Sequence, residues 1–158
     1  MNKFAILAVA GAACTANAQL INEFQPNPTG GDPAQVNFEL FGTAGATFNG
    51  VIYALDTDFG GGVDNPIDRL SAVSGTFDAN GILNVMIDDL ENPSFSVVLA
   101  SGGAGGLGDT YDGTNGAALF GTVFDAINIA DNDTDGANSI IPTLGVGTDF
   151  AFTGDEPR

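Results

Sequence analysis

Short runs in which apolar and polar residues alternate, separated by Gly, Asn, Asp and Pro, most constrain how this chain can fold. In the run VNFELF, Val36, Phe38 and Leu40 fall on one side of an extended strand. Asn37 and Glu39 fall on the other side. Similar runs recur at roughly ten-residue intervals with turn-forming residues between them, and no segment of helical length shows a 3.6-residue apolar stripe. The pattern predicts an all-β sandwich or barrel.

The expected strands can be placed along the chain. They cover residues 19–24, 35–41, 50–55, 70–77, 81–87, 94–100, 120–129 and 140–144. Between two of them, residues 78–81 (DANG) have the chemistry of a tight hairpin, because Asn-Gly favours positive φ. Residues 116–129 come nearest to a helical pattern, but Gly121 and the β-branched residues favour a strand. The segment 101–116 contains seven glycines, and we expect a mobile loop there.

The first 18 residues have the three parts of a secretory signal peptide. Lys3 supplies the positive start, residues 4–13 form an apolar run too short to span a bilayer, and Ala18 ends a small-residue cleavage site. A lipoprotein signal ending at Cys14 is the alternative, although the branched residue expected three positions earlier is missing. We expect a signal peptide (1–18), one β-sandwich domain (19–150) and a C-terminal tail (151–158). The mature protein should be secreted or lie at the cell surface without membrane association.

The charge of the chain limits its partners. Twenty Asp and Glu residues stand against three Lys and Arg, a net charge of −17. Nucleic acids and anionic membranes repel such a chain, because binding to them depends on Lys and Arg. We therefore predict no nucleic-acid partner, and cations, neutral glycans and other proteins remain. In the alternative interpretation, the acidity serves only solubility.

The inventory of catalytic residues predicts that the protein is not an enzyme. The sequence has no His, and its only cysteine, Cys14, would leave with the signal, which excludes catalytic triads and the usual zinc sites. Residues 103–108 match GxGxxG, but Asp109 and Asp112 follow, where a dinucleotide site needs a helix and no negative charge. Carboxylate-only chemistry, such as glycoside hydrolysis, is the alternative left by elimination.

One acidic segment has the spacing of a calcium loop. Asp131, Asp133 and Asp135 precede Gly136 in the pattern D-x-D-x-D-G, which turns three carboxylates toward a hard cation. Position twelve is Pro142 rather than the Glu of an EF-hand, so the loop is not an EF-hand, and a looser extracellular site that binds calcium is one interpretation. An exposed acidic turn is the alternative. Weaker versions of the pattern are formed by Asp56, Asp58 and Asp64, and by Asp109 with Asp112.

Residues 19–42 (QLINEFQPNPTGGDPAQVNFELFG) resemble the opening of lamin tail domains in secreted bacterial proteins. Those domains begin with an I-N-E strand, pass through a loop with Asn-Pro and Gly-Asp, and return on a strand that ends in E-L-aromatic. Residues 89–100 and 121–131 are similar to later strands of such domains. The matching residues of the opening are Ile21, Asn22, Glu23, Asn27, Pro28, Gly31, Asp32, Glu39, Leu40 and Phe41.

The resemblance implies an immunoglobulin-like β-sandwich that serves in attachment or interaction. With the export signal, it predicts a secreted, non-catalytic module that binds an extracellular protein or glycan, with an extracellular hydrolase or its accessory domain as the alternative. Ile21 and Phe24 should share a core with the apolar side of residues 36–40. For Asn22, Glu23 and Glu39 we expect a structural role, in which the carboxylates accept backbone N–H groups of a neighbouring loop. A catalytic pair of glutamates is the competing interpretation.

Overall fold

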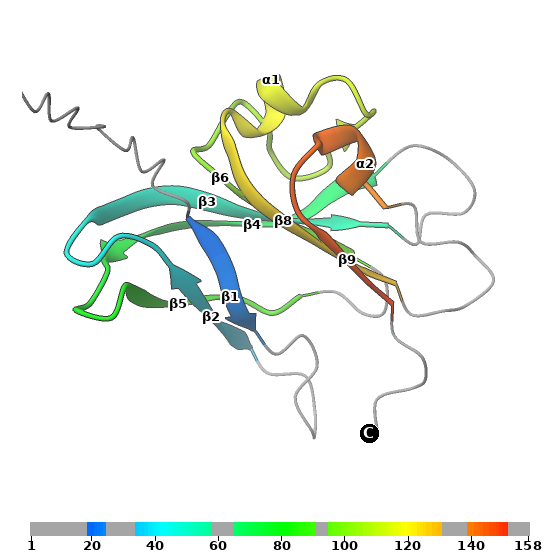
Figure 1. Cartoon of the computed structure of the whole chain (residues 1–158). Helices are drawn as coiled ribbons and strands as arrows, with labels where there is room; N and C mark the ends of the chain where they lie inside the picture. The colour runs from blue at the N-terminus through cyan, green and yellow to red at the C-terminus, as the bar shows by residue number, and fades with distance from the viewer. Residues whose placement is uncertain (1–18, 25–33, 58–64, 91–94, 131–138, 152–158) are drawn as a thin grey trace, which may run out of the picture.

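The computed structural model describes residues 19–24, 34–57, 65–90, 95–130 and 139–151. Within these ranges the chain is mostly β, as predicted, and strand β2 has the predicted bounds. Two short helices interrupt the strands (Figure 1). The elements are β1 (Leu20–Phe24), β2 (Gln35–Phe41), β3 (Thr47–Asp56), β4 (Asn65–Thr76), β5 (Ile82–Asp88), β6 (Phe95–Ala100), β7 (Thr110–Tyr111), α1 (Gly116–Phe120), β8 (Val123–Ala130), α2 (Ile141–Leu144) and β9 (Thr148–Ala151).

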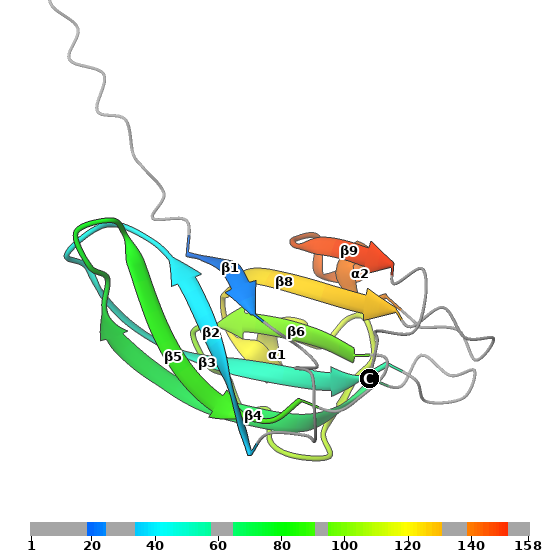
Figure 2. The ribbon, with the colours of Figure 1, turned by 90° about the horizontal axis from the view of Figure 1, so that it is seen from below.

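The strands form two packed sheets. The small sheet has the order β1-β2-β5, and the large sheet has the order β7-β4-β3-β6-β8-β9. Neighbouring strands are antiparallel except β8 and β9, which run parallel. Figure 2 shows the small sheet crossing the large one at a steep angle. The arrangement is that of a β-sandwich in which connections between strands turn corners from one sheet to the other.

Two of the connections between the sheets lie at the same end of the sandwich. The chain passes from β2 to β3 and from β4 to β5, each time changing sheet. The two connections are tied together, since Gly42 N–H donates to Gly81 O at 2.8 Å. The hairpin predicted for residues 78–81 is therefore wrong in part. The turn closes, with Asp78 N–H donating to Ile82 O at 2.8 Å, but the strands that it joins belong to different sheets.

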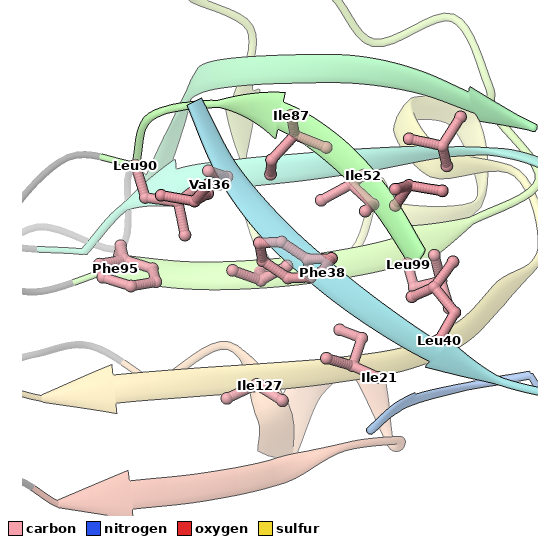
Figure 3. Close-up of a cluster of buried hydrophobic side chains, with 14 of the residues drawn as sticks. Ile21, Val36, Phe38, Leu40, Ile52, Ile87, Leu90, Phe95, Leu99 and Ile127 are labelled. Carbon is pink, nitrogen blue, oxygen red and sulfur yellow. The ribbon is translucent and has the colours of Figure 1, made fainter. Parts of the chain in front are cut away.

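The main core fills the space between the sheets. Figure 3 shows the inward-facing residues of β2 above side chains of β6 and β8. The rings of Phe24 and Phe38 stack with centroids 4.5 Å apart. Ile21 and Phe24 join the apolar side of β2 there, as predicted. The buried members of this cluster are Ile21, Val36, Phe38, Leu40, Phe48, Ile52, Ala54, Val73, Phe77, Val85, Ile87, Leu90, Phe95, Val97, Leu99, Ile127 and Ile129.

A second core covers the opposite face of the large sheet. Figure 1 shows α1, α2 and the segments beside them on the side away from the small sheet. Burial on both faces explains why every residue of β6 is buried, where a one-sided strand would alternate. We call this cluster the second core; its buried members are Tyr53, Leu55, Ile67, Val98, Ala100, Tyr111, Phe120, Ala126 and Ile140.

The glycine-rich segment 101–116 was expected to be mobile, and this expectation is wrong. Its backbone is bound into the second core: Gly103 N–H donates to the Tyr53 hydroxyl at 3.2 Å, and Gly108 N–H donates to Ile67 O at 2.8 Å. A Cβ on Gly103 would lie 2.6 Å from the backbone oxygen of Leu119. Gly103 therefore serves close backbone packing, whereas Gly108 has the positive φ of 82° that favours glycine. The first helix after the GxGxxG pattern begins only at Gly116.

The two helices occupy segments for which strands were predicted. Helix α1 takes the start of the segment 116–129 and ends at Gly121, which has φ 74°. Helix α2 replaces the strand predicted at residues 140–144. Pro142 lies in its first turn, where a missing N–H is harmless, and Gly145 ends it with φ 73°. None of the helices in the described ranges is long and apolar enough to cross a membrane.

Candidate functional site

The outer face of the small sheet is one of two sheet surfaces that the described residues leave uncovered. The other lies at one end of β3 and β4 in the large sheet, where the exposed residues are Thr47, Asn49, Leu70, Ala72, Ser74 and Thr76. The inner face of the small sheet lies on the main core, whereas β6 and the second half of β3 in the large sheet are buried on both sides. Alternation along the strands of the small sheet places polar and apolar side chains together on its outer surface. We call it the outer face; it consists of Leu20, Asn22, Glu23, Gln35, Asn37, Glu39, Phe41, Ile82, Asn84, Met86 and Asp88.

A β-bulge brings three sequence-predicted residues together on this face. Ile21 pairs with Leu40, but the next pair is Glu23 with Glu39, so that Asn22 is the extra residue. Because of the bulge, Asn22 and Glu23 are both exposed on the same face. The Asn22 side-chain amide donates to Glu39 Oε1 at 2.5 Å. The partner of Glu39 is therefore a side chain of β1, where a backbone N–H of a loop was expected.

The remaining side chains of the face form rows across the strands. One row is apolar: Leu20 and Ile82 are the partners of Phe41 on either side, and Leu20 and Phe41 are 41% and 43% exposed. In the next row Glu39 lies opposite Asn84, whose side-chain oxygen accepts from the Asn37 amide at 3.0 Å. Met86, 56% exposed, follows.

This arrangement suits binding better than catalysis. The side chains of Asn22, Glu39, Asn37 and Asn84 are already held by hydrogen bonds to one another, so a partner that uses them loses less side-chain entropy on binding. The glutamates that could form a catalytic pair, Glu23 and Glu39, lie on an open sheet surface. Acid–base chemistry gains most where a site excludes water around the reacting groups, and this face does not do so.

A carboxylate of the large sheet anchors the bulged strand. Asp125 in β8 accepts the backbone N–H of Ile21 at Oδ2 (2.9 Å) and that of Ala126 at Oδ1 (2.9 Å). Burial raises the pKa of the Asp125 carboxyl above its ordinary value, although both N–H donors favour the charged form. The sequence did not single out Asp125; the available signal was one acidic residue in a mostly apolar run, VFDAINIA.

The predicted calcium ligands Asp131, Asp133 and Asp135 lie outside the described residues, as do Asp58 and Asp64. Strand β8 ends at Ala130, so the D-x-D-x-D-G pattern follows it directly. Within the described ranges, no group of three or more Asp, Glu, His or Cys side chains could hold a metal ion.

Asp109 and Asp112, which formed a weaker version of the calcium-loop pattern, stabilise turns within the segment 101–116. Asp109 Oδ2 accepts Gly106 N–H at 2.9 Å, and Asp112 Oδ1 accepts Thr114 N–H at 2.8 Å. The Thr114 backbone and hydroxyl donors, followed by Asn115 N–H, hold the pKa of Asp112 below its ordinary value. Asp109 and Asp112 thus act as turn acceptors.

Buried polar groups lie at the end of the large sheet where β8 leads into the acidic segment. Ser96 Oγ donates to Asn128 Oδ1 at 2.6 Å, and both residues are buried. Thr57, directly after β3, is also buried, and its hydroxyl has no hydrogen-bond partner in the described part of the chain. An unpaired buried hydroxyl is uncommon, because it loses its hydration without compensation.

Comparison with known proteins identifies no relative: no family model matches the chain, and neither does any curated protein or solved structure.

Proposed function

We propose that this protein is a secreted, non-catalytic β-sandwich module that mediates attachment or interaction outside the cell. The observation that carries the proposal is the outer face of the small sheet. There the hydrogen-bonded pairs Asn22–Glu39 and Asn37–Asn84 lie beside the exposed side chain of Phe41 on a surface that the described residues leave open. An extracellular protein or a glycan is the partner that we assign to this face.

Export is supported by the signal pattern of residues 1–18 and by where the sandwich begins. Strand β1 starts at Leu20, so cleavage after Ala18 leaves the strand and its pairing with β2 intact. We place the mature protein outside the cell or at the cell surface, and the lamin-tail resemblance favours a bacterial source.

We also propose that the sandwich is immunoglobulin-like, of the lamin-tail type. The resemblance implies that the I-N-E strand and the E-L-aromatic strand are consecutive and antiparallel. In support, β1 and β2 are antiparallel neighbours in which Ile21 pairs with Leu40. Both residues are buried in the main core, while Asn22, Glu23 and Glu39 share the outer face.

Calcium is the proposed stabilising ion, held by Asp131, Asp133 and Asp135. The support is the ligand spacing directly after β8. The test is the melting temperature of the secreted protein with millimolar calcium and with chelator. We expect calcium to raise it in the wild type and in a Glu23→Gln control, and to have no effect in an Asp131→Asn, Asp133→Asn double variant. Equal shifts in all three proteins would contradict the site, and so would the lack of any shift.

The alternative function is an extracellular hydrolase, or an accessory domain for one, that uses carboxylates. The specific observation in its favour is that Glu23 and Glu39 are partners across neighbouring strands. Most glycoside hydrolases use a pair of carboxyl groups as their catalytic residues. The pair is exposed, and this is why binding is the leading proposal.

One experiment separates the two functions. The purified secreted protein is incubated with a panel of soluble and insoluble polysaccharides and with extracellular proteins, and both bound protein and released reducing ends are measured. Binding without release that is lost in Phe41→Ser and kept in Leu107→Ser supports the module; Leu107 is an exposed apolar residue outside the outer face. Release that is lost in Glu39→Gln would establish the hydrolase and contradict the module.

A further inference from the structure

We infer that the outer face binds a cationic segment of another protein, in which basic side chains alternate with apolar ones. The inference rests on the proposed function and names the chemical class of its partner. Its first support is the charge of the face itself. Glu23, Glu39 and Asp88 belong to the face, and none of its residues is basic.

The second support is the repulsion between two of these carboxylates. Glu23 and Glu39 are register partners on neighbouring strands, and like charges directly opposite each other destabilise a sheet. A basic side chain from a partner between them would convert this repulsion into two attractions. Glu39 uses Oε1 for the Asn22 amide, and its Oε2 has no hydrogen bond within the described residues. A guanidinium or ammonium group can therefore bind there while Asn22 keeps the carboxylate oriented.

The third support is the position of the apolar side chains relative to these carboxylates. Leu20 and Phe41 form an exposed apolar row beside the Glu23–Glu39 row, and Met86 is exposed beyond it. Successive rows are two residues apart along β2, roughly 7 Å, which is also the spacing of alternate side chains in an extended peptide. An extended segment with the pattern apolar-x-basic-x-apolar would match these rows. The exposed ring of Phe41 adds a surface on which a cation can stack.

The fourth support is the field of the whole chain. The net charge of −17 attracts cationic partners from a distance and repels anionic polysaccharides. A neutral glycan could donate hydroxyl hydrogen bonds to the carboxylates of the face, but it would gain nothing from that field. A cationic protein segment uses both, and this favours it as the occupant.

The test uses the secreted protein and a fluorescent peptide with the repeat Leu-Thr-Arg-Thr, compared with a peptide that carries Glu in place of Arg. Anisotropy titrations at several salt concentrations give the dissociation constants. We expect the Arg peptide to bind, more weakly as salt rises, and the Glu peptide not to bind. Glu39→Gln and Phe41→Ser should each weaken binding by about fivefold or more.

Two control variants separate the face from bulk charge. Asp112→Asn removes one carboxylate charge from the loop at the second core and keeps an acceptor for Thr114, and Leu107→Ser removes an exposed apolar side chain elsewhere. Both variants should bind the Arg peptide with a dissociation constant within about twofold of that of the wild type. Equal affinity in all variants would overturn the inference, because binding would then follow net charge alone.

The remaining outcomes distinguish the inference from the function on which it rests. If a neutral polysaccharide binds, loses its affinity in Phe41→Ser, and the Arg peptide does not bind, the inference fails and the proposed function stands. If neither peptide, polysaccharide nor protein binding depends on the outer face, both fail. Circular dichroism of each variant checks that the fold is retained.

Discussion

The backbone N–H of Ile21 donates to the carboxylate of Asp125 at 2.9 Å and so joins the edge strand of the small sheet to β8 of the large sheet. Asp125→Ala removes this acceptor, and we expect it to lower the free energy of unfolding by about 1–2 kcal/mol. Asp125→Asn keeps an oxygen in place without burying a charge, so its stability should equal or exceed that of the wild type at neutral pH. Urea denaturation measures both; equal losses in the two variants would contradict the role assigned to the hydrogen bond.

The same carboxyl makes stability depend on pH. Burial raises the pKa of Asp125 in the folded chain above the ordinary value of 3.8, so the folded state binds this proton more tightly than the unfolded state does. The resulting stabilisation is fully present below pH 3.8 and is lost as the pH rises through the folded-state pKa. The unfolding free energy of the wild type minus that of Asp125→Asn should therefore fall with rising pH. A difference that rises or stays constant would be inconsistent with a buried carboxyl.

The packing of the glycine-rich segment gives a matched pair of variants. An alanine Cβ at position 103 would lie 2.6 Å from the backbone oxygens of Ala118 and Leu119, whereas at Gly106 the nearest atom is Asp109 Oδ2 at 3.8 Å. We expect Gly103→Ala to lower the free energy of unfolding by about 2–4 kcal/mol, and Gly106→Ala to lower it by less than about 1 kcal/mol.

Near-ultraviolet circular dichroism can follow this segment specifically. The chain has no Trp, and both of its tyrosines, Tyr53 and Tyr111, lie in the second core. Gly103→Ala should therefore reduce the tyrosine signal, while Gly106→Ala leaves it unchanged. A mobile segment would instead tolerate both substitutions equally well.

The unpaired hydroxyl of Thr57 predicts a stabilising substitution. Thr57 is buried and Oγ1 has no hydrogen-bond partner among the described residues, which costs roughly 1–3 kcal/mol. Thr57→Val replaces the hydroxyl with a methyl group of similar shape and should raise the unfolding free energy by about 1 kcal/mol. Thr57→Ser keeps the hydroxyl and should be less stable than the wild type. A lower unfolding free energy in Thr57→Val would show that the hydroxyl has a hydrogen-bond or ligand partner. If the free energy fell only when calcium is present, that partner would be the calcium ion.

Alternation along single strands was sufficient to predict much of the sandwich. Strand β2 could be placed to the residue because one side of VNFELF is apolar and the other polar. Strand β6 was also predicted, but a continuous apolar run does not indicate which elements cover each of its two sides. The turn at residues 78–81 was recognised from Asn-Gly, yet local turn chemistry is the same whether two strands pair or diverge into different sheets.

The second core could not be predicted because its sequence signals are sparse. Helices α1 and α2 have about one turn each, too short for a helical period to be visible. The glycines of residues 101–108 indicated flexibility, whereas Gly103 and Gly105 allow close approach to the backbone of Leu119, which a pattern of neighbouring residues does not reveal.

Three residues of the candidate site, Asn22, Glu23 and Glu39, were singled out from the sequence for a structural role, and their arrangement was not predicted. Regular alternation would point Asn22 and Glu23 to opposite faces; the bulge that turns both outward is not visible in the letters I-N-E. The calcium ligands Asp131, Asp133 and Asp135 remain a sequence prediction. Asp125 went unnoticed because its partner, the N–H of Ile21, is a backbone group far away in sequence.

The central claim is that the outer face of the small sheet is the contact surface, and methyl NMR tests it most directly. Spectra of the purified protein are recorded with increasing amounts of the Leu-Thr-Arg-Thr peptide, or of a polysaccharide that binds. We predict shifts of the methyl signals of Leu20, Ile82 and Met86, with those of Leu107 and Val146 unchanged. Shifts confined to Leu107 or Val146, with the outer-face methyl groups unaffected, would contradict the claim.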